Sequence, residues 1–264
     1  MSLAWWNGRA VPAETVQIAP DDAGFLHGDG LFETLRVNDG KAQHAGAHLD
    51  RLLAGLRRVE IEIPEDRESL ETAVAAVARA APRPAARLRI TVTRGVQGIP
   101  TRLVATAPYQ PPSESQYRQG VAVLLVPDLR IDARSPLAGL KSLCWQTNRL
   151  ALLRAERAGA FEALLVNERG RLAEGARSNL LVGLDDGIFT PPLEDGCLPG
   201  TVRRRLLDAG AIAERSLLPE DLGRAREILL TNSLIGVLPV GRLDGREVFV
   251  GEARRRLKAA ANSF

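Results

Sequence analysis

The chain has 264 residues, which is long for one domain and suits two modest domains, although length alone leaves both arrangements open. Hydrophobic residues make up 45% and charged residues 25%, the ordinary composition of a globular protein that folds in water. The 35 basic and 32 acidic residues nearly balance and aromatic residues amount to only 4%, which argues against nucleic-acid binding, whether by a basic face or by stacked aromatic side chains.

The first elements expected along the chain are hairpins. In residues 3–13, the pair Asn7-Gly8 lies between apolar flanks and supplies the positive φ angles that a two-residue turn requires. A loop over residues 21–30 precedes a strand of alternating character over residues 31–37. An Asn-Asp-Gly turn at 38–40 closes that strand, so the fold begins with strands.

Helical periodicity begins after the second hairpin. Apolar side chains recur at helical spacing and predict one buried helix face, formed by Leu49, Leu52, Leu53, Leu56 and Val59. A further helix is expected over residues 66–81, followed by strands over 87–95 and 102–107. We therefore expect residues 1–110 to form an N-terminal α+β domain.

A second domain is expected beyond a proline-rich connection. Residues 108–115 contain three prolines and small polar side chains, which favours a solvated linker over 111–119 and a C-terminal domain over 120–264. In this domain we expect strands at 120–127 and 162–167, helices at 145–158 and from 200, and hairpin turns at 168–170 and 185–187. The second domain is thus mostly strand with helices around it.

Cysteine usage and the amino-terminal sequence bear on the compartment. Cys144 and Cys197 are far apart and lack metal-ligand spacing, which favours reduced thiols in a cytosolic protein and predicts no metal site. The first residues show no basic segment followed by an apolar run, and no stretch approaches 18 uncharged apolar residues. We expect a cytoplasmic protein that does not enter a membrane.

Lys141 is the residue that points most directly to chemistry. The chain holds three lysines among its 35 basic residues, and Lys141 is the one in an apolar mid-chain setting, Leu-Lys-Ser-Leu-Cys-Trp. A primary amine, unlike a guanidinium, can lose its proton when desolvated, attack a carbonyl and form a Schiff base. The alternative is an ordinary surface lysine whose stem covers apolar neighbours.

Two segments could bind an anion. In Leu198-Pro199-Gly200-Thr201-Val202, a turn leads into a helix whose first backbone N–H groups belong to Thr201 and Val202. In the segment 230–234, Thr, Asn and Ser side chains end an apolar strand, where donors could face the same anion. An ordinary helix cap and an ordinary turn are the competing interpretations, and spacing does not separate them.

A glutamate and a histidine complete the candidates. Glu174 lies between two apolar strands, where its carboxylate could hold a proton on a ring nitrogen or merely cap a turn. His27 stands beside Asp29 in a glycine-rich segment, which is more typical of a turn than of a metal site.

These segments, taken in order, resemble the class IV, fold-type IV pyridoxal-phosphate (PLP) enzymes over about residues 21–240. The resemblance rests on Gly24-Phe-Leu-His-Gly-Asp-Gly-Leu-Phe-Glu-Thr-Leu-Arg-Val37, His48-Leu-Asp-Arg-Leu52, Lys141, Glu174-Gly-Ala-Arg-Ser-Asn179 and Leu198-Pro-Gly-Thr-Val-Arg203. The family includes branched-chain aminotransferases, D-amino-acid aminotransferases and aminodeoxychorismate lyase. Its fold implies two domains, a smaller N-terminal α/β sandwich-like lobe and a larger C-terminal lobe with a strand-rich core.

The resemblance also implies roles for individual residues. Lys141 would form the internal aldimine with PLP and then act as acid and base at the substrate Cα. Arg51 would bind the cofactor phosphate together with Thr201, Val202, Ser233 and Leu234. Glu174 would pair with the protonated pyridine nitrogen, and Asn179 and Arg177 would support these contacts.

Within the family the chain looks most like aminodeoxychorismate lyase. Phe32-Glu33-Thr34 differs from the Phe-Glu-Gly usual in branched-chain aminotransferases, and the segment 231–240 looks like its equivalent in aminodeoxychorismate lyases. The resemblance then implies release of pyruvate and 4-aminobenzoate, a folate precursor, with Thr34 assisting the elimination. A class IV aminotransferase for D- or branched-chain amino acids is the alternative. Family likeness further implies a homodimer and a small amino compound as substrate.

Overall fold

The computed structural model describes residues 2–262, and the chain divides into two compact units. The first unit runs to Pro111 and also contains the separate segment Leu140–Cys144, while Pro112–Gly139 and the chain from Trp145 onward form the second. Sequence alone places Lys141 within a C-terminal domain of residues 120–264. The structure instead groups it with the residues of the first unit.

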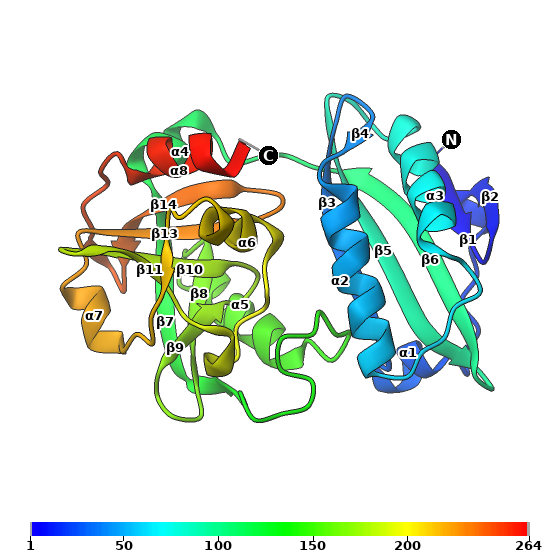
Figure 1. The fold of residues 1–264 in the computed structure, drawn as a ribbon, viewed down its shortest axis with the longest axis horizontal. Helices are drawn as coiled ribbons and strands as arrows, with labels where there is room; N and C mark the ends of the chain where they lie inside the picture. Colours follow the sequence, from blue (N-terminus) through cyan, green and yellow to red (C-terminus); the bar gives the residue numbers. More distant parts are fainter. Residues whose placement is uncertain (1, 263–264) are drawn as a thin grey trace. The chain divides into compact units, whose positions relative to one another are not determined.

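The first unit is a six-stranded antiparallel sheet with helices on one face (Figure 1). The strand order is β2-β1-β6-β5-β3-β4. Its elements are β1 Leu3–Trp6, β2 Arg9–Pro12, the 3-10 helix η1 Ala13–Thr15, α1 Ala23–His27, β3 Gly30–Asn38, β4 Lys41–Ala42, α2 Ala45–Arg58, α3 Arg67–Arg79, β5 Ala85–Val96 and β6 Ile99–Pro108. The predicted hairpins are confirmed, with Asn7, Gly8, Asp39 and Gly40 all at positive φ.

The core of this unit lies between the sheet and the helices α2 and α3. Leu35 of β3 and Leu88 of β5 face each other across the strand pair and are fully buried, as is Leu49 of α2. Successive side chains of a strand point to opposite faces, so one face of β3 and β5 joins the core and the other carries Phe32, Thr34, Arg87 and Arg89. The sheet therefore presents a second face that the core does not use.

A short helix, α1, replaces the loop expected over residues 21–30. The Asp22 side chain caps it by accepting hydrogen bonds from the N–H groups of Gly24 (2.8 Å) and Phe25 (3.4 Å), and Gly28 ends it in the left-handed region at φ 68°. Five residues are too few for a periodic apolar pattern, which explains why the sequence predicts only a loop.

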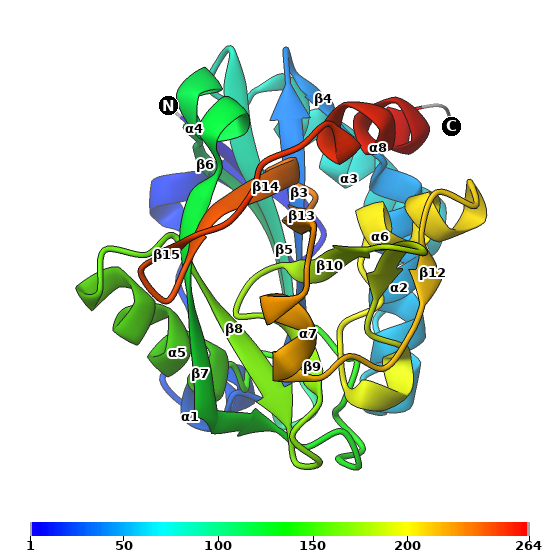
Figure 2. The ribbon, with the colours of Figure 1, turned by 90° about the vertical axis from the view of Figure 1, so that its left-hand side faces the viewer.

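The second unit is built on a nine-stranded mixed sheet (Figure 2). The strand order is β12-β11-β10-β13-β14-β7-β8-β9, with β15 beside β14. Its elements are α4 Glu114–Gln119, β7 Val121–Ile131, α5 Gln146–Arg157, β8 Glu162–Asn167, β9 Leu172–Gly175, β10 Asn179–Leu184, β11 Gly187–Thr190, the 3-10 helix η2 Leu193–Asp195, α6 Thr201–Asp208, β12 Ala213–Glu214, α7 Pro219–Gly223, β13 Glu227–Asn232, β14 Gly236–Leu243, β15 Arg246–Glu247 and α8 Ala253–Asn262.

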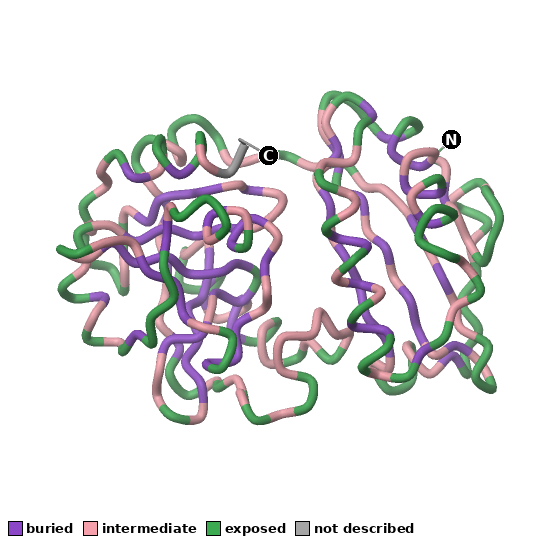
Figure 3. The backbone as a smooth tube through the Cα atoms, in the orientation of Figure 1, coloured by how far each residue is buried: buried purple, intermediate pink, exposed green. Residues whose placement is uncertain are grey.

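Burial in this unit is greatest along its central strands (Figure 3). All six residues of β8 are buried, because β8 runs parallel to β7 and helix α5 packs on the pair. The strands, hairpin turns and helices predicted for this half of the chain are confirmed. The proposed linker 111–119 contains α4, whose Ser113 and Gln116 form a capping box. None of the helices within residues 2–262 is long and apolar enough to span a membrane.

Candidate active site

The segment that contains Lys141 forms a short edge strand beside the start of β3. The Lys141 carbonyl accepts a hydrogen bond from the Phe32 N–H at 2.9 Å, and the Leu143 N–H donates to the Gly30 carbonyl at 2.9 Å. Leu31 and Ser142 form the antiparallel bridge between these two bonds. The backbone of Lys141 is therefore fixed by the sheet of the first unit, which gives its side chain a defined starting point.

The Lys141 amine and the Arg89 guanidinium both lie over the Phe32 ring. The Lys141 Nζ is 4.7 Å from the ring centroid and the Arg89 Cζ is 3.8 Å from it. Arg89 is half-buried, and burial together with the neighbouring charge of Arg87 lowers its pKa. Within residues 2–262, no carboxylate lies within ion-pair distance of Arg89. Two cations gathered at one ring without a carboxylate for Arg89 favour the binding of an anion.

Sequence reasoning missed Arg89, although a signal for it exists. In Arg87-Leu88-Arg89-Ile90, Leu88 and Ile90 belong to the core, so the alternation of a strand places both arginines on the opposite face. Thr34, predicted as a catalytic residue, is the direct partner of Arg89 in the β3–β5 register. The structure thus brings Lys141, Thr34 and Arg89 to one region of that face.

A buried charge cluster joins β3 to α2. Both Glu33 carboxylate oxygens accept from Arg51, through Nε and Nη2 at 2.7 Å each, and Oε2 also contacts the Nδ1 of His48 at 2.7 Å. Burial opposes ionisation of Glu33, but the Arg51 charge and the hydrogen bonds from His48 and Arg51 together lower the Glu33 pKa to about 2. Burial lowers the pKa of His48, so neutral His48 donates to the carboxylate. Glu33 therefore fixes the guanidinium of Arg51, a residue predicted to bind phosphate.

In the second unit, Glu174 and Asn179 hold the turn that precedes α6. The Glu174 Oε2 accepts from the Leu198 N–H at 2.8 Å, and the Asn179 Nδ2 donates to the Leu198 carbonyl at 2.8 Å. Gly200 packs so closely on this amide that a Cβ on it would lie 1.9 Å from the Asn179 Oδ1. The absence of a side chain at Gly200 is therefore a steric requirement of the turn.

The amino terminus of α6 follows this turn directly. Gly200 is the N-cap and provides no side chain to cap the helix, which begins with Thr201 and Val202. Backbone N–H groups at such a terminus and the helix dipole together favour an anion. Arg203, only 3% exposed, anchors the helix by donating to the Pro191 carbonyl at 2.8 Å and by an ion pair with Glu214.

The predicted residues Ser233 and Leu234 lie in a turn organised by Asn232. The Asn232 Oδ1 accepts from the N–H groups of Leu234 at 2.9 Å and of Ile235 at 3.0 Å. The Asn232 Nδ2 donates to the Arg177 carbonyl at 2.9 Å and so ties this turn to the segment between Glu174 and Asn179. The Leu234 N–H thus donates to Asn232, and this hydrogen bond fixes the shape of the turn that is predicted to bind phosphate.

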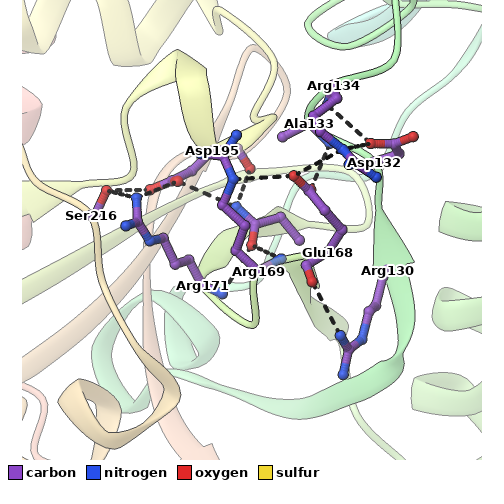
Figure 4. Close-up of polar contacts among 10 residues, drawn as sticks. Arg130, Asp132, Ala133, Arg134, Glu168, Arg169, Arg171, Asp195 and Ser216 are labelled. Atoms are coloured by element: carbon purple, nitrogen blue, oxygen red, sulfur yellow. Dashed lines mark hydrogen bonds and ion pairs between the residues drawn. The ribbon is translucent and has the colours of Figure 1, made fainter.

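A polar network supports the chain just before Leu198 (Figure 4). Asp195, fully buried, accepts from Asn167 at 3.3 Å, from Arg171 at 3.4 Å and from Ser216 at 2.6 Å. The Asn167 Oδ1 also accepts from the backbone N–H of Arg171 at 3.0 Å. The β8–β9 turn and the 3-10 helix η2 are therefore joined, which limits the positions open to the turn at Leu198.

The predicted site residues divide between the two units. Lys141, Thr34 and Arg51 belong to the first, while Glu174, Asn179, Thr201, Val202, Ser233 and Leu234 belong to the second. Within the second unit, Glu174, Asn179 and the start of α6 meet at one turn.

Comparison with known proteins places these residues in a family. The family model of class IV amino-transferases matches residues 30–243. A bifunctional aminodeoxychorismate lyase and D-amino acid transaminase of Mycobacterium tuberculosis is 31% identical over 251 residues, with 86% of each chain covered. The crystal structure of 4-amino-4-deoxychorismate lyase from Pseudomonas aeruginosa is 32% identical, with a TM-score of 0.85 and 97% of each chain covered.

A further solved structure extends the likeness of the fold. A hypothetical aminotransferase from Mycobacterium tuberculosis in its PLP-bound form has a TM-score of 0.88 at 26% identity, covering 99% of this chain and 98% of that one. The fold is that of fold-type IV PLP enzymes, as expected from the sequence. With the family model matched over most of its length, the chain belongs to the class IV aminotransferase family.

Proposed function

We propose that this protein is a 4-amino-4-deoxychorismate lyase, which releases pyruvate and 4-aminobenzoate, a folate precursor. Membership of the class IV family makes the chain a PLP-dependent enzyme. The observation that carries the proposal is the grouping of a lysine amine, a threonine and a half-buried arginine at Phe32. These groups correspond to a base, a hydroxyl and an anion-binding group, which the elimination requires.

The residues present fit the cofactor. The turn closed on Gly200 and the start of α6 fit a phosphate, because a Cβ at Gly200 would displace Asn179 and the helix terminus offers backbone N–H groups. Within the second unit, the turn at Ser233 and Leu234 would also hold a phosphate. Arg51 of the first unit, fixed by Glu33, is a guanidinium suited to binding a phosphate. The Glu174 carboxylate would accept a hydrogen bond from the pyridine nitrogen. When bound, PLP supplies an electron sink for negative charge at the substrate Cα.

The chain's own residues would carry the proton movements. Lys141 Nζ would remove the proton from the ring carbon that bears the amino group. The Thr34 hydroxyl would assist as the ether C–O bond breaks, and the departing enolpyruvate would take up a proton to become pyruvate. Loss of the proton and of this group leaves an aromatic ring, 4-aminobenzoate. Arg89 would hold a substrate carboxylate in this arrangement.

The second candidate is an aminotransferase of the same family that acts on D- or branched-chain amino acids. Its cofactor residues would be the same, and Arg89 would meet the carboxylate of an amino acid equally well. The 32% identity to a lyase over nearly the whole chain, together with Thr34 in the β3 strand, favours the lyase.

One assay separates the two activities. The PLP-loaded protein is incubated with 4-amino-4-deoxychorismate, and separately with D-alanine or a branched-chain amino acid plus 2-oxoglutarate. We expect 4-aminobenzoate and pyruvate in equal amounts from the first mixture. Amino transfer in the second mixture without any release of 4-aminobenzoate in the first would refute the lyase and support the aminotransferase.

Substitution of Gly200 by alanine should weaken PLP binding by about tenfold, the effect of losing roughly one hydrogen bond. The new Cβ would lie 1.9 Å from the Asn179 Oδ1, so the amide that holds Leu198 must move. The dissociation constant is measured by titrating the apoprotein with PLP. Gly223→Ala is the matched control, because nothing lies within 4 Å of a Cβ there. Equal affinity of the two variants would show that this turn does not bind the cofactor.

A homodimer and a cytoplasmic location complete the proposal. Three large apolar side chains of the first unit, Phe25, Leu26 and Ile99, are each more than half exposed, and a partner subunit would cover such residues. Cys144 and Cys197 are both free thiols, which supports a reducing compartment. Light scattering on the purified protein measures the oligomeric state directly.

A further inference from the structure

The strand β8 begins with a glutamate whose carboxylate is buried. Glu162 is 0% exposed, and its Oε1 accepts from the adjacent Ala163 N–H at 3.0 Å. Its Oε2 accepts from the Ser178 hydroxyl at 2.9 Å and from the Arg177 N–H at 3.3 Å. Burying a carboxylate costs free energy unless it is well hydrogen-bonded, so a buried glutamate at this position calls for a role in the fold or in the site.

The segment that Glu162 contacts is a tight link between β9 and β10. The Gly175 N–H donates to the Ser178 carbonyl at 2.7 Å, and the Ala176 N–H donates to the Ala163 carbonyl at 2.8 Å. A Cβ on Gly175 would lie 2.4 Å from the Ser178 Oγ and 3.1 Å from the Glu162 Cγ. The link therefore packs directly against the glutamate, with no space for a side chain between them.

The charge of Glu162 is only partly compensated. Burial raises the pKa of Glu162 to about 7, while the Arg177 charge and the hydrogen bonds from Ser178, Ala163 and Arg177 lower it to a smaller extent. The Arg177 guanidinium, which is 40% exposed, approaches the carboxylate only to 3.8 Å and donates instead to the Phe161 carbonyl at 2.6 Å. At neutral pH the carboxylate thus carries a cost that favourable contacts do not fully offset.

The residues on either side of this link, which spans residues 175–178, belong to the proposed cofactor site. Glu174 immediately precedes it and Asn179 immediately follows it, and both bind Leu198 of the turn before α6. The Arg177 carbonyl within the link accepts from Asn232, which organises the turn at Ser233 and Leu234. A displacement of the link would therefore reach three of the contacts assigned to PLP.

We propose that Glu162 is a positioning residue for the cofactor, which holds the link 175–178 so that Glu174, Asn179 and Asn232 present a preformed site. This inference rests on the proposed binding of PLP at these residues. Glu162 would not itself touch the cofactor. It acts through Ser178 and the backbone of Arg177, and its effect is on affinity for PLP more than on folding.

The test is Glu162→Gln, a substitution of nearly equal size. Glutamine keeps a single acceptor oxygen, so it cannot accept both from the Ala163 N–H and from the Ser178 and Arg177 pair, and the dissociation constant for PLP should rise roughly tenfold. Folding raises the pKa of Glu162 from 4.5 to about 7, so the stabilisation that its protonated form gives is complete below pH 4.5 and is lost as the pH rises through about 7. At pH 8 the Glu162 charge therefore adds no stability, and removing it should not destabilise the apoprotein. A loss of affinity without a loss of stability is the result that a merely structural residue would not give.

Ser178→Ala and the double variant complete the experiment. Since both residues act through one hydrogen bond, the affinity losses of Glu162→Gln and Ser178→Ala should be less than additive. Glu168→Gln, just beyond the other end of β8, is the control and should leave the PLP affinity unchanged. If Glu162→Gln fails to fold, the PLP affinity of Ser178→Ala alone tests whether the hydrogen bond between these two residues positions the site.

The possible results separate the inference from the proposed function. Wild-type apoprotein that does not bind PLP would refute the proposed cofactor site itself. Wild type that binds PLP, with both variants within twofold of its affinity, would overturn the role of Glu162 alone. A fall in apoprotein stability that matches the fall in affinity would likewise overturn it, since Glu162 would then be needed only for folding.

Discussion

Replacing Lys141 by alanine should lower kcat by a factor of at least roughly 10²–10⁴, the contribution of a positioned acid–base group. The segment 140–144 is held to β3 by backbone hydrogen bonds, which do not depend on the side chain at Lys141. The variant should therefore fold normally and lose only its amine. Arginine at this position should be equally inactive, since a guanidinium retains its proton at neutral pH. Turnover and the circular dichroism spectrum measure the two effects separately.

The chain offers a matched control for this substitution in Lys41. Lys41 lies in β4 of the same unit and is exposed, so Lys41→Ala should retain full activity. Borohydride treatment of the PLP-loaded wild type should leave a pyridoxyl group on Lys141, located by mass spectrometry of peptides. Label on Lys41 or Lys258 instead, or normal turnover by Lys141→Ala, would remove Lys141 from the proposed chemistry.

Glu33→Gln should lower the free energy of unfolding at pH 7 by about 3–5 kcal/mol, because it leaves the Arg51 charge without its buried partner. Glu33 is 1% exposed and contacts both Arg51 and His48 at 2.7 Å. The same change frees the guanidinium that the site is proposed to use for phosphate, so PLP affinity should fall as well. Urea unfolding of the apoprotein and PLP titration measure the two losses.

The pH dependence of stability gives a second measure of the same cluster. The Glu33 pKa falls from an ordinary value of 4.5 to about 2 on folding, so its contribution is present above about pH 4.5 and is lost as the pH falls toward 2. A shift of this size corresponds to roughly 3 kcal/mol. Glu33→Gln should lack this part of the acid-induced loss. Glu71→Gln, which breaks an exposed ion pair with Arg67, is the control and should cost less than about 1 kcal/mol. Equal losses of unfolding free energy in the two variants would show that the buried cluster stabilises the fold no more than an exposed ion pair does.

Local patterns in the sequence predict most of the elements. The hairpin turn at Asn7-Gly8 requires positive φ angles, and the helix α2 repeats its apolar residues at the helical period, so each signal lies within a few residues. The sequence also predicts the turn before α6, because Pro-Gly-Thr is typical of a helix terminus in any fold. Local patterns do not connect Lys141, Arg51 and Glu174 with one another. The resemblance to a family assigns all three to one cofactor.

Contacts between distant segments were beyond the reach of such patterns. The pairing of Lys141 with Phe32 consists of backbone hydrogen bonds, which leave no mark on the side chains. Glu162 follows a phenylalanine and precedes an alanine at the start of a strand, and only the return of Ser178 shows that its carboxylate is buried. The Glu33 cluster was closer to being found, since Glu33 shares the period-two face of the buried Leu35.

The edge strand 140–144 makes the first unit discontinuous in the chain, and this limits how the protein can be divided. A fragment that ends at Pro111 would lack the segment that satisfies the Gly30 carbonyl and the Phe32 N–H. It would also lack the reactive amine, whereas the remaining fragment would carry that amine without the strand that fixes it. Neither half is therefore an independent module with a complete lysine site, and we expect a gene split at this boundary to need both products to reassemble before any lysine chemistry occurs.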